Sequence, residues 1–299
     1  MHVCSTIKNH IGSALSTVEQ NMSAITAAYP VTQLDDATNT LQSSLAYHVQ
    51  TGGNKTRALM SLYASDALHL RQSDAIVAAT IVETLHNASL IHDDIQDDEI
   101  ERRGQPALWQ KYDVGTAICT GDFLIAKAYA ECAKISDVKL IPELIELVHE
   151  AVQETIAGQT VDINCTTVTT SVKHYEMTAI AKSGPLLGLS LAIPLLLFGY
   201  KKAEIHSLLR PCIEPFSLSY QIIDDLHDVV TDAEHDCLNL VNVLAQEMSL
   251  KEAKAYAYSR TELLLGAAKR QLSLIPNHAG VYLEYCIEQL RHKSLQVTS

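Results

Sequence analysis

Leu, Ile, Val and Ala recur at helical spacing through most of this chain, and this hydrophobic periodicity limits its fold more than any other feature. Few segments alternate apolar and polar residues, as half-buried strands do. Turn-forming residues are also scarce, because the 12 glycines and 8 prolines are about 7% of 299 residues, against about 12% in an average protein. We therefore predict an all-α fold of roughly ten to twelve helices, in a single domain that covers residues 1–299.

Predicted turns fall where glycine and proline gather along the chain. They lie at 52–53, 103–106, 158, 184–185, 211–215 and 276–277. The uncharged stretch 183–200 just reaches the length of a membrane-spanning helix, but it stands alone and contains several glycines and prolines. We predict that it is a core helix and that the protein has no transmembrane segment.

Charge and cysteine usage exclude several classes of function. The net charge of −13 disfavours nucleic-acid binding, which depends on Lys and Arg that neutralise phosphates. The seven cysteines are odd in number, scattered and without a C-x-x-C pair, which is typical of reduced thiols. With no basic and apolar leader at the N-terminus, these features predict a cytoplasmic protein.

An acidic segment, LHNASLIHDDIQDDEIERRG at 85–104, is predicted to be helical up to about Glu101, in a helix that has Ser73 as its N-cap. Residues at i, i+4, i+7, i+8 and i+11 share one helix face, and here they are His86, Leu90, Asp93, Asp94 and Asp97. Carboxylates at this spacing repel one another. A cationic partner is therefore expected beside them.

A second acidic helix face lies in QIIDDLHD, with the same D-D-x-x-D pattern. Its residues are Gln221, Asp224, Asp225 and Asp228. Two solvated acidic faces would explain the pattern without function, but both segments are flanked by apolar residues. Clustered carboxylates without His or Cys at ligand spacing favour hard cations, and Mg²⁺ in particular shares its coordination with substrate phosphates. The pair of motifs predicts a site for Mg²⁺ and a diphosphate.

Basic residues occur in the same neighbourhoods. They are Lys55 and Arg57 after the Gly52-Gly53 turn, Arg102 and Arg103 after the first acidic run, and Lys182. For Lys55 and Arg57, ordinary surface charge is an equally good explanation. The Arg102-Arg103 pair at the end of an acidic helix is better explained by contacts with phosphate.

Together these motifs resemble the trans-polyprenyl diphosphate synthase family. In the family's order they are GGNKTR (52–57), the acidic segment 85–104, TGD (120–122), GQTVD (158–162), AKSG (181–184) and QIIDDLHD (221–228). The resemblance implies a large helical bundle around a deep apolar cavity whose mouth carries both Asp motifs. It also implies a homodimer, and a reaction that joins isopentenyl diphosphate to an allylic diphosphate.

The resemblance further implies a role for each matching residue. Three Mg²⁺ ions that hold the allylic diphosphate would be bound by Asp93, Asp94, Asp97, Asp224, Asp225 and Asp228. That diphosphate would also contact Arg102 and Lys182. Isopentenyl diphosphate would be bound by Lys55, Arg57, His86 and Arg103, and the carbocation would be lined by Ser183 and Gln221. His86 has the alternative interpretation of a structural histidine.

Product length is predicted from the residues one helical turn before Asp93. In the resembling family, an aromatic side chain here acts as a floor that stops growth at about fifteen carbons, whereas this chain has Ala88 and Ser89. We expect a product of twenty carbons or more, such as geranylgeranyl diphosphate, with the limit set by Phe123 or Tyr129. Alternatively, another residue closes the tunnel at the same height.

Three departures from the family pattern leave other functions open. Asn54 replaces a Lys and Ala58 replaces a Pro, and the segment 231–244 lacks the Lys that usually follows the second Asp motif. The missing lysines motivate a catalytically weak partner subunit of a heteromeric synthase, although the retained six carboxylates argue against it. A class I terpene cyclase shares the Mg²⁺ chemistry but not the isopentenyl diphosphate residues.

Overall fold

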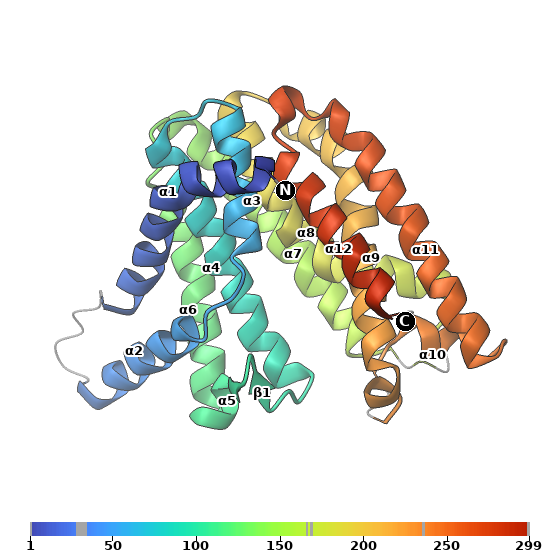
Figure 1. Ribbon diagram of the computed structural model, residues 1–299. Helices are drawn as coiled ribbons and strands as arrows, with labels where there is room; N and C mark the ends of the chain where they lie inside the picture. The colour runs from blue at the N-terminus through green and yellow to red at the C-terminus, as the bar shows by residue number, and fades with distance from the viewer. Residues whose placement is uncertain (1, 28–34, 166, 168–169, 235–236, 298–299) are drawn as a thin grey trace. The chain divides into compact units, whose positions relative to one another are not determined.

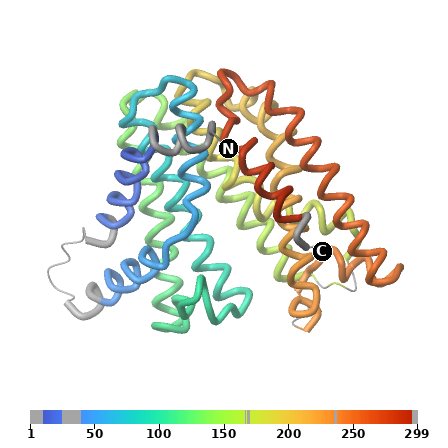
Figure 2. Tube along the Cα trace, viewed as in Figure 1, coloured from blue at the N-terminus to red at the C-terminus, as the bar shows by residue number. Residues whose placement is uncertain are grey.

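The structure is a computed structural model that describes residues 2–27, 35–165, 167, 170–234 and 237–297 (Figure 1). The described residues form twelve α-helices and one hairpin of two short strands, so the all-α prediction is confirmed. Contacts between residues divide the chain into two compact units, Met1–Ile145 and Glu146–Ser299. The Cα trace in Figure 2 follows the chain through each unit. The single domain stays a prediction.

The first unit is organised around α4. Its elements are α1 (His2–Ala27), α2 (Asp35–Gln50), α3 (Thr56–Ala67), α4 (Gln72–Gln96), β1 (Glu101–Arg102), β2 (Gln105–Pro106), α5 (Leu108–Lys111), α6 (Val114–Cys132) and the 3₁₀ helix η1 (Val138–Leu140). α4 packs against α3, α6 and α1 (Figure 1). One core cluster joins Met22, Leu45, Ala88, Ile91 and Leu124. These aliphatic contacts hold α4 by burial of apolar surface.

The second unit is organised around α9. Its elements are most of α7 (Ile141–Asp162), then α8 (Val172–Phe198), α9 (Lys202–Glu234), α10 (Leu240–Leu244), α11 (Leu250–Gln271), the 3₁₀ helices η3 (Leu272–Leu274) and η4 (Pro276–His278), and α12 (Val281–Val297). α9 packs against α8, α11 and α12 (Figure 1). Tyr175, Leu218, Ile222 and Leu226 lie in its core.

Among the described helices, α8 alone is long and apolar enough to cross a membrane by length and composition, and 61% of its apolar window is buried inside the protein. A buried core helix passes the same test, so the absence of a transmembrane segment stays a prediction.

Three of the predicted turns are wrong. Gly158 lies inside α7, Gly184-Pro185 inside α8, and residues 211–215 inside α9. α8 and α9 pack against each other, and α7 approaches the backbone of α8 closely at Gly158. Tertiary packing routinely overrides the local preference of glycine and proline. By contrast, the turn at 52–53 is confirmed by its positive φ angles, and residues 103–104 turn the hairpin.

Candidate active site

The first acidic cluster, Asp93, Asp94 and Asp97, lies at the C-terminal end of α4. The helix begins at Gln72 and ends at Gln96, so the predicted N-cap at Ser73 and the predicted extension to Glu101 are both wrong. Asp97 is the C-cap, and Asp98 turns the chain away with a φ of 53°. Carboxylates at a helix C-terminus are unfavourable because they face the negative end of the helix dipole. The helix therefore stops where acidic residues accumulate.

A hairpin returns the chain to this cluster. Arg103 and Gly104 have φ angles of 56° and 76°, and two left-handed residues between paired strands form a type I′ turn. Arg102 Nε then donates to Asp94 Oδ1 at 2.6 Å. Arg102 is therefore the cationic partner that the sequence predicts beside the first acidic cluster. Burial nevertheless raises the pKa of the Asp94 carboxyl, and its Oδ2 is buried without a hydrogen-bond partner.

Arg103 packs on the Gly52-Gly53 turn. One of its guanidinium nitrogens donates to the carbonyl oxygen of Gly52. A Cβ at Gly53 would lie 2.7 Å from the Arg103 guanidinium, and Gly53 has a φ of 128°. Glycine suits this positive φ, and a Cβ here would displace the end of the Arg103 side chain. The turn and the hairpin, 51 residues apart, therefore meet through one arginine.

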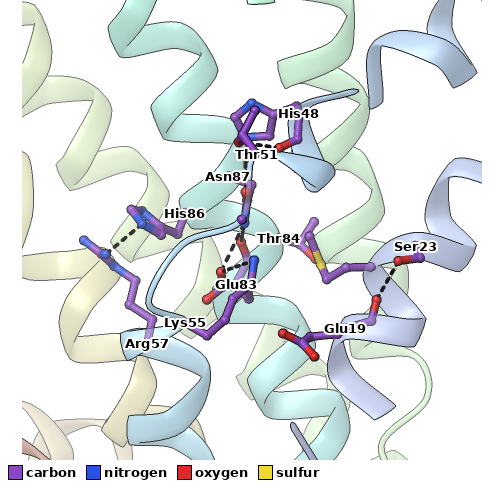
Figure 3. A network of polar contacts seen from close by, with 12 residues as sticks. Glu19, Ser23, His48, Thr51, Lys55, Arg57, Glu83, Thr84, His86 and Asn87 are labelled. Atoms are coloured by element: carbon purple, nitrogen blue, oxygen red, sulfur yellow. Dashed lines mark hydrogen bonds and ion pairs between the residues drawn. The ribbon is translucent and has the colours of Figure 1, made fainter. Parts of the chain in front are cut away.

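Lys55 and Arg57 contact successive turns of α4, as Figure 3 shows. Lys55 precedes α3 with a φ of 51°, and its Nζ lies 3.4 Å from Glu83 Oε1. Arg57 Nη1 lies 3.1 Å from His86 Nε2. Arg57 can only donate, so His86 Nε2 accepts and the neutral ring carries its proton on Nδ1. Burial lowers the pKa of His86 well below its usual value, and the charge of Arg57 acts in the same direction.

Sequence reasoning missed three polar residues behind this basic group. His48 Nε2 lies 3.1 Å from Asn87 Oδ1, and Asn87 Nδ2 donates to the Glu83 carbonyl at 2.7 Å and to Glu83 Oε1 at 3.3 Å (Figure 3). The polar chain runs from His48 through Asn87 and Glu83 to Lys55. Glu83 precedes His86 by three residues and Asn87 by four on one helix. Because residues three and four apart share a face, Glu83 and Asn87 could have been found from the sequence.

The second acidic cluster, Asp224, Asp225 and Asp228, lies on α9. Asp225 is buried, and its two oxygens accept from Gln221 Nε2 at 3.1 Å and from the Leu240 N–H at 2.7 Å. Burial raises the pKa of Asp225 to about 7. Asp224 is partly exposed and pairs with Lys293 of α12 at 3.2 Å, whereas Asp228 is exposed. The two predicted acidic clusters thus lie in different units of the chain.

Lys182 is positioned by the close packing of α7 on α8. A Cβ at Gly158 would lie 2.4 Å from the Ala181 carbonyl carbon and from the Lys182 nitrogen, so glycine is required for this approach. Lys182 Nζ donates to Asp162 Oδ2 at 2.6 Å, and Ser183 follows it on a partly exposed part of α8. The GQTVD and AKSG motifs, each a weak signal alone, therefore contact each other in the structure.

The residues predicted to set product length differ in exposure. Ala88 is 1% exposed within the core cluster of the first unit, whereas Ser89 is partly exposed and its hydroxyl donates to the His86 carbonyl. Phe123 and Tyr129 lie on α6, both partly exposed, and Phe123 packs against the same cluster. Ser89 is the better placed of the two small residues to face a growing chain.

The carboxylates in part fit the predicted Mg²⁺. Among the residues that the structure describes, no three Asp, Glu, His or Cys side chains are grouped closely enough to form a metal centre by themselves. Mg²⁺ commonly takes only one or two carboxylates and completes its coordination with water and substrate phosphate. The unpartnered buried oxygen of Asp94 and the partly exposed Asp224 suit that role. Asp225 suits it less, because both its oxygens already accept hydrogen bonds.

Comparison with known proteins identifies the family of this chain. Residues 38–239, more than half of the chain, match the family model described as polyprenyl synthetase. The chain therefore belongs to the polyprenyl synthetase family. The match includes both acidic clusters and every predicted site residue.

Named relatives lie within the same class. The chain is 30% identical over 204 residues to a chloroplastic geranylgeranyl pyrophosphate synthase of Capsicum annuum, covering 65% of this chain and 54% of that protein. It is 29% identical over 280 residues to a probable farnesyl diphosphate synthase of Bradyrhizobium diazoefficiens, covering 83% and 81%. A solved geranylgeranyl pyrophosphate synthetase structure from Pyrococcus horikoshii shares the fold with a TM-score of 0.82 at 20% identity, covering 96% and 98%. In three relatives of 29 to 30% identity the match spans only 54 to 62% of their length.

Proposed function

We propose that this protein is a Mg²⁺-dependent prenyltransferase that condenses isopentenyl diphosphate with an allylic diphosphate. The observation that carries the proposal is the arrangement of the first unit. There Lys55, Arg57, His86 and Arg103 lie around one end of α3 and one face of α4, and Arg102 reaches the acidic cluster of the same helix. A group of cations beside carboxylates is what binding of diphosphates with divalent cations requires.

The acidic clusters would hold the metal ions. We assign ligand roles to Asp93, Asp94 and Asp97 of the first cluster and to Asp224 and Asp228 of the second, and a positioning role to Asp225. Bound Mg²⁺, three ions in the resembling family, would stabilise negative charge on the departing diphosphate. Arg102 and Lys182, each now paired with an aspartate, would donate hydrogen bonds to the allylic diphosphate, as the resemblance implies.

Isopentenyl diphosphate would bind to the basic group of the first unit. Arg57 and Arg103 supply forked donors that suit phosphate, and the neutral His86 adds its Nδ1–H. Glu83 and Asn87 would act as positioning residues, because they hold Lys55 by contacts that do not involve substrate. The hydrogen bond from Arg57 uses Nε2 of His86, so it is compatible with a role of the His86 Nδ1–H in binding.

The condensation itself requires no nucleophilic side chain. After the allylic carbon–oxygen bond ionises, the double bond of isopentenyl diphosphate attacks the cation, and a proton is lost to the departed diphosphate. Ser183 and Gln221 would line the cation, and aliphatic walls would exclude the water that quenches it. We propose a product of twenty carbons or more, because Ala88 and Ser89 leave no aromatic floor one turn before Asp93.

The homodimer in this proposal follows the family resemblance, and the location follows the cysteine usage. We propose that residues 1–299 act as one catalytic domain and that the protein forms a homodimer. We also propose that it works in the cytoplasm, binds no nucleic acid and has no transmembrane segment. The alternatives remain a catalytically weak partner of a heteromeric synthase and a class I terpene cyclase. The basic group at α3 and α4 favours the synthase over the cyclase, since a cyclase uses no isopentenyl diphosphate.

Product analysis tests the proposal. The purified protein is incubated with Mg²⁺, isopentenyl diphosphate and allylic primers of five, ten or fifteen carbons, and the chains are identified by mass spectrometry. We expect chains of at least twenty carbons, no product in excess chelator, and a loss of kcat by several orders of magnitude in Asp94→Ala and Asp224→Ala. No elongation with any primer would favour the partner subunit, and cyclic hydrocarbon from primer alone would favour the cyclase.

A further inference from the structure

Lys293 of α12 lies beside the second acidic cluster, although it is 69 residues from that cluster in sequence. Its Nζ donates to Asp224 Oδ1 at 3.2 Å and lies 5.9 Å from the centre of the Tyr220 ring, one turn earlier on α9. The Lys293 side chain is 47% exposed and that of Asp224 is 38% exposed. The ammonium is therefore held at the cluster but stays accessible to a ligand.

The charge around this contact is one-sided. α9 carries Asp224, Asp225 and Asp228, then Asp232 and Glu234, and no Lys or Arg occurs between 211 and 250 in the sequence. A diphosphate that approaches such a surface is repelled unless cations accompany it. Bound metal ions can supply part of the positive charge that a diphosphate needs here. Basic residues on another helix have to supply the remainder.

The ammonium group of a lysine can contact an aspartate and a diphosphate at the same time, because it has three hydrogen-bond donors. The contact with Asp224 uses one, and the aromatic face of Tyr220 favours a cation without consuming a donor. Lys182, the other lysine of this unit predicted to contact diphosphate, already donates to Asp162. Lys293 is consequently well placed to add a donor beside Asp224.

We propose that Lys293 is a substrate-binding residue, whose ammonium bridges Asp224 and the diphosphate of the allylic substrate. It would take the place of the lysine that the segment 231–244 lacks. The proposal rests on the proposed prenyltransferase function and adds to it a residue from α12. It also explains how a chain without that lysine remains a full enzyme rather than a weak partner subunit.

The test compares Lys293→Gln with Lys293→Arg and with a matched control, Lys269→Gln. Lys269 of α11 also binds a carboxylate of α12, with Nζ 2.6 Å from Glu288 Oε1, but does not contact the acidic cluster. Binding of inorganic pyrophosphate in the presence of Mg²⁺ is measured by calorimetry, and KM is measured separately for the allylic and the isopentenyl substrate.

We expect Lys293→Gln to weaken pyrophosphate binding and to raise the allylic KM by about tenfold or more, which is the usual effect of one charge-assisted hydrogen bond. The KM for isopentenyl diphosphate should change by less than about twofold, Lys293→Arg should retain most of the affinity, and Lys269→Gln should bind like wild type.

Unchanged pyrophosphate affinity in Lys293→Gln, with an active wild type, overturns this proposal and leaves the proposed function standing. An equal loss in Lys269→Gln also overturns it, because the effect would then come from the packing of α12. If the wild type neither binds pyrophosphate with Mg²⁺ nor makes product, the proposed function fails, and this proposal fails with it.

Discussion

Gly158→Ala should both destabilise the protein and displace Lys182. The added Cβ would lie 2.4 Å from two backbone atoms of α8, where ordinary contacts are 3.4 Å or longer. Backbone atoms cannot rotate away as a side chain can, so α7 and α8 must separate by about 1 Å. Overpacking of this kind costs up to about 3 kcal/mol, and the better helix propensity of alanine returns about 1 kcal/mol. We expect a net loss of up to about 2 kcal/mol in the free energy of unfolding.

Urea unfolding measures this loss, and Gly266→Ala is the matched control. Gly266 lies inside α11, and a Cβ there would meet only the end of Arg270 at 3.5 Å. The control should therefore gain about 0.5 to 1 kcal/mol. In steady-state kinetics Gly158→Ala should raise KM for the allylic substrate more than for isopentenyl diphosphate, because Lys182 moves with α8. A Gly158→Ala protein as stable as wild type, with an unchanged allylic KM, would refute the reasoning.

Three further predictions follow from the first unit. Asn54→Lys should lower KM for isopentenyl diphosphate by about tenfold and leave the allylic KM unchanged; an unchanged or higher value would show that Lys55 and Arg57 already fill the site. Ser89→Phe should shorten the products at a similar rate of first condensation, and Ala88→Phe should do so with added strain because its site is fully packed; an unchanged product distribution in Ser89→Phe would contradict the floor argument. Burial lowers the pKa of His48 from 6.5 to about 4, so the unfolded chain takes up the proton first as pH falls. Wild type should thus lose up to about 3 kcal/mol of unfolding free energy between pH 6.5 and 4, and His48→Gln should lose clearly less in the same denaturation series.

Periodicity was sufficient to predict the fold class and most helices, because aliphatic residues at helical spacing leave few alternatives. It did not predict the helix boundaries correctly, because it placed turns inside helices and extended one helix too far. The sequence predicted turns at Gly158 and Pro185, yet both lie inside helices, where tertiary packing outweighs local propensity. Conversely, α4 stops at Gln96, before the predicted end at Glu101, because acidic residues oppose the negative end of the helix dipole.

For the candidate site, spacing predicted the two acidic clusters but not the partners of their side chains. Contacts within one helix, such as Asn87 with Glu83, could be read from positions four apart. Contacts between elements could not: the hairpin that brings Arg102 to Asp94 depends on two left-handed residues, and Lys293 reaches Asp224 only because α12 packs against α9. Such pairings depend on tertiary packing, which a single sequence does not record.

Calorimetric titration of inorganic pyrophosphate tests the central claim most directly, which is that the protein needs both acidic clusters for Mg²⁺-dependent binding of diphosphate. Wild type, Asp94→Ala and Asp224→Ala are titrated with and without Mg²⁺. We predict binding by wild type only when Mg²⁺ is present, and a loss of at least tenfold in affinity when either cluster is changed. Equal binding without Mg²⁺, or unchanged binding in both variants, would contradict the account.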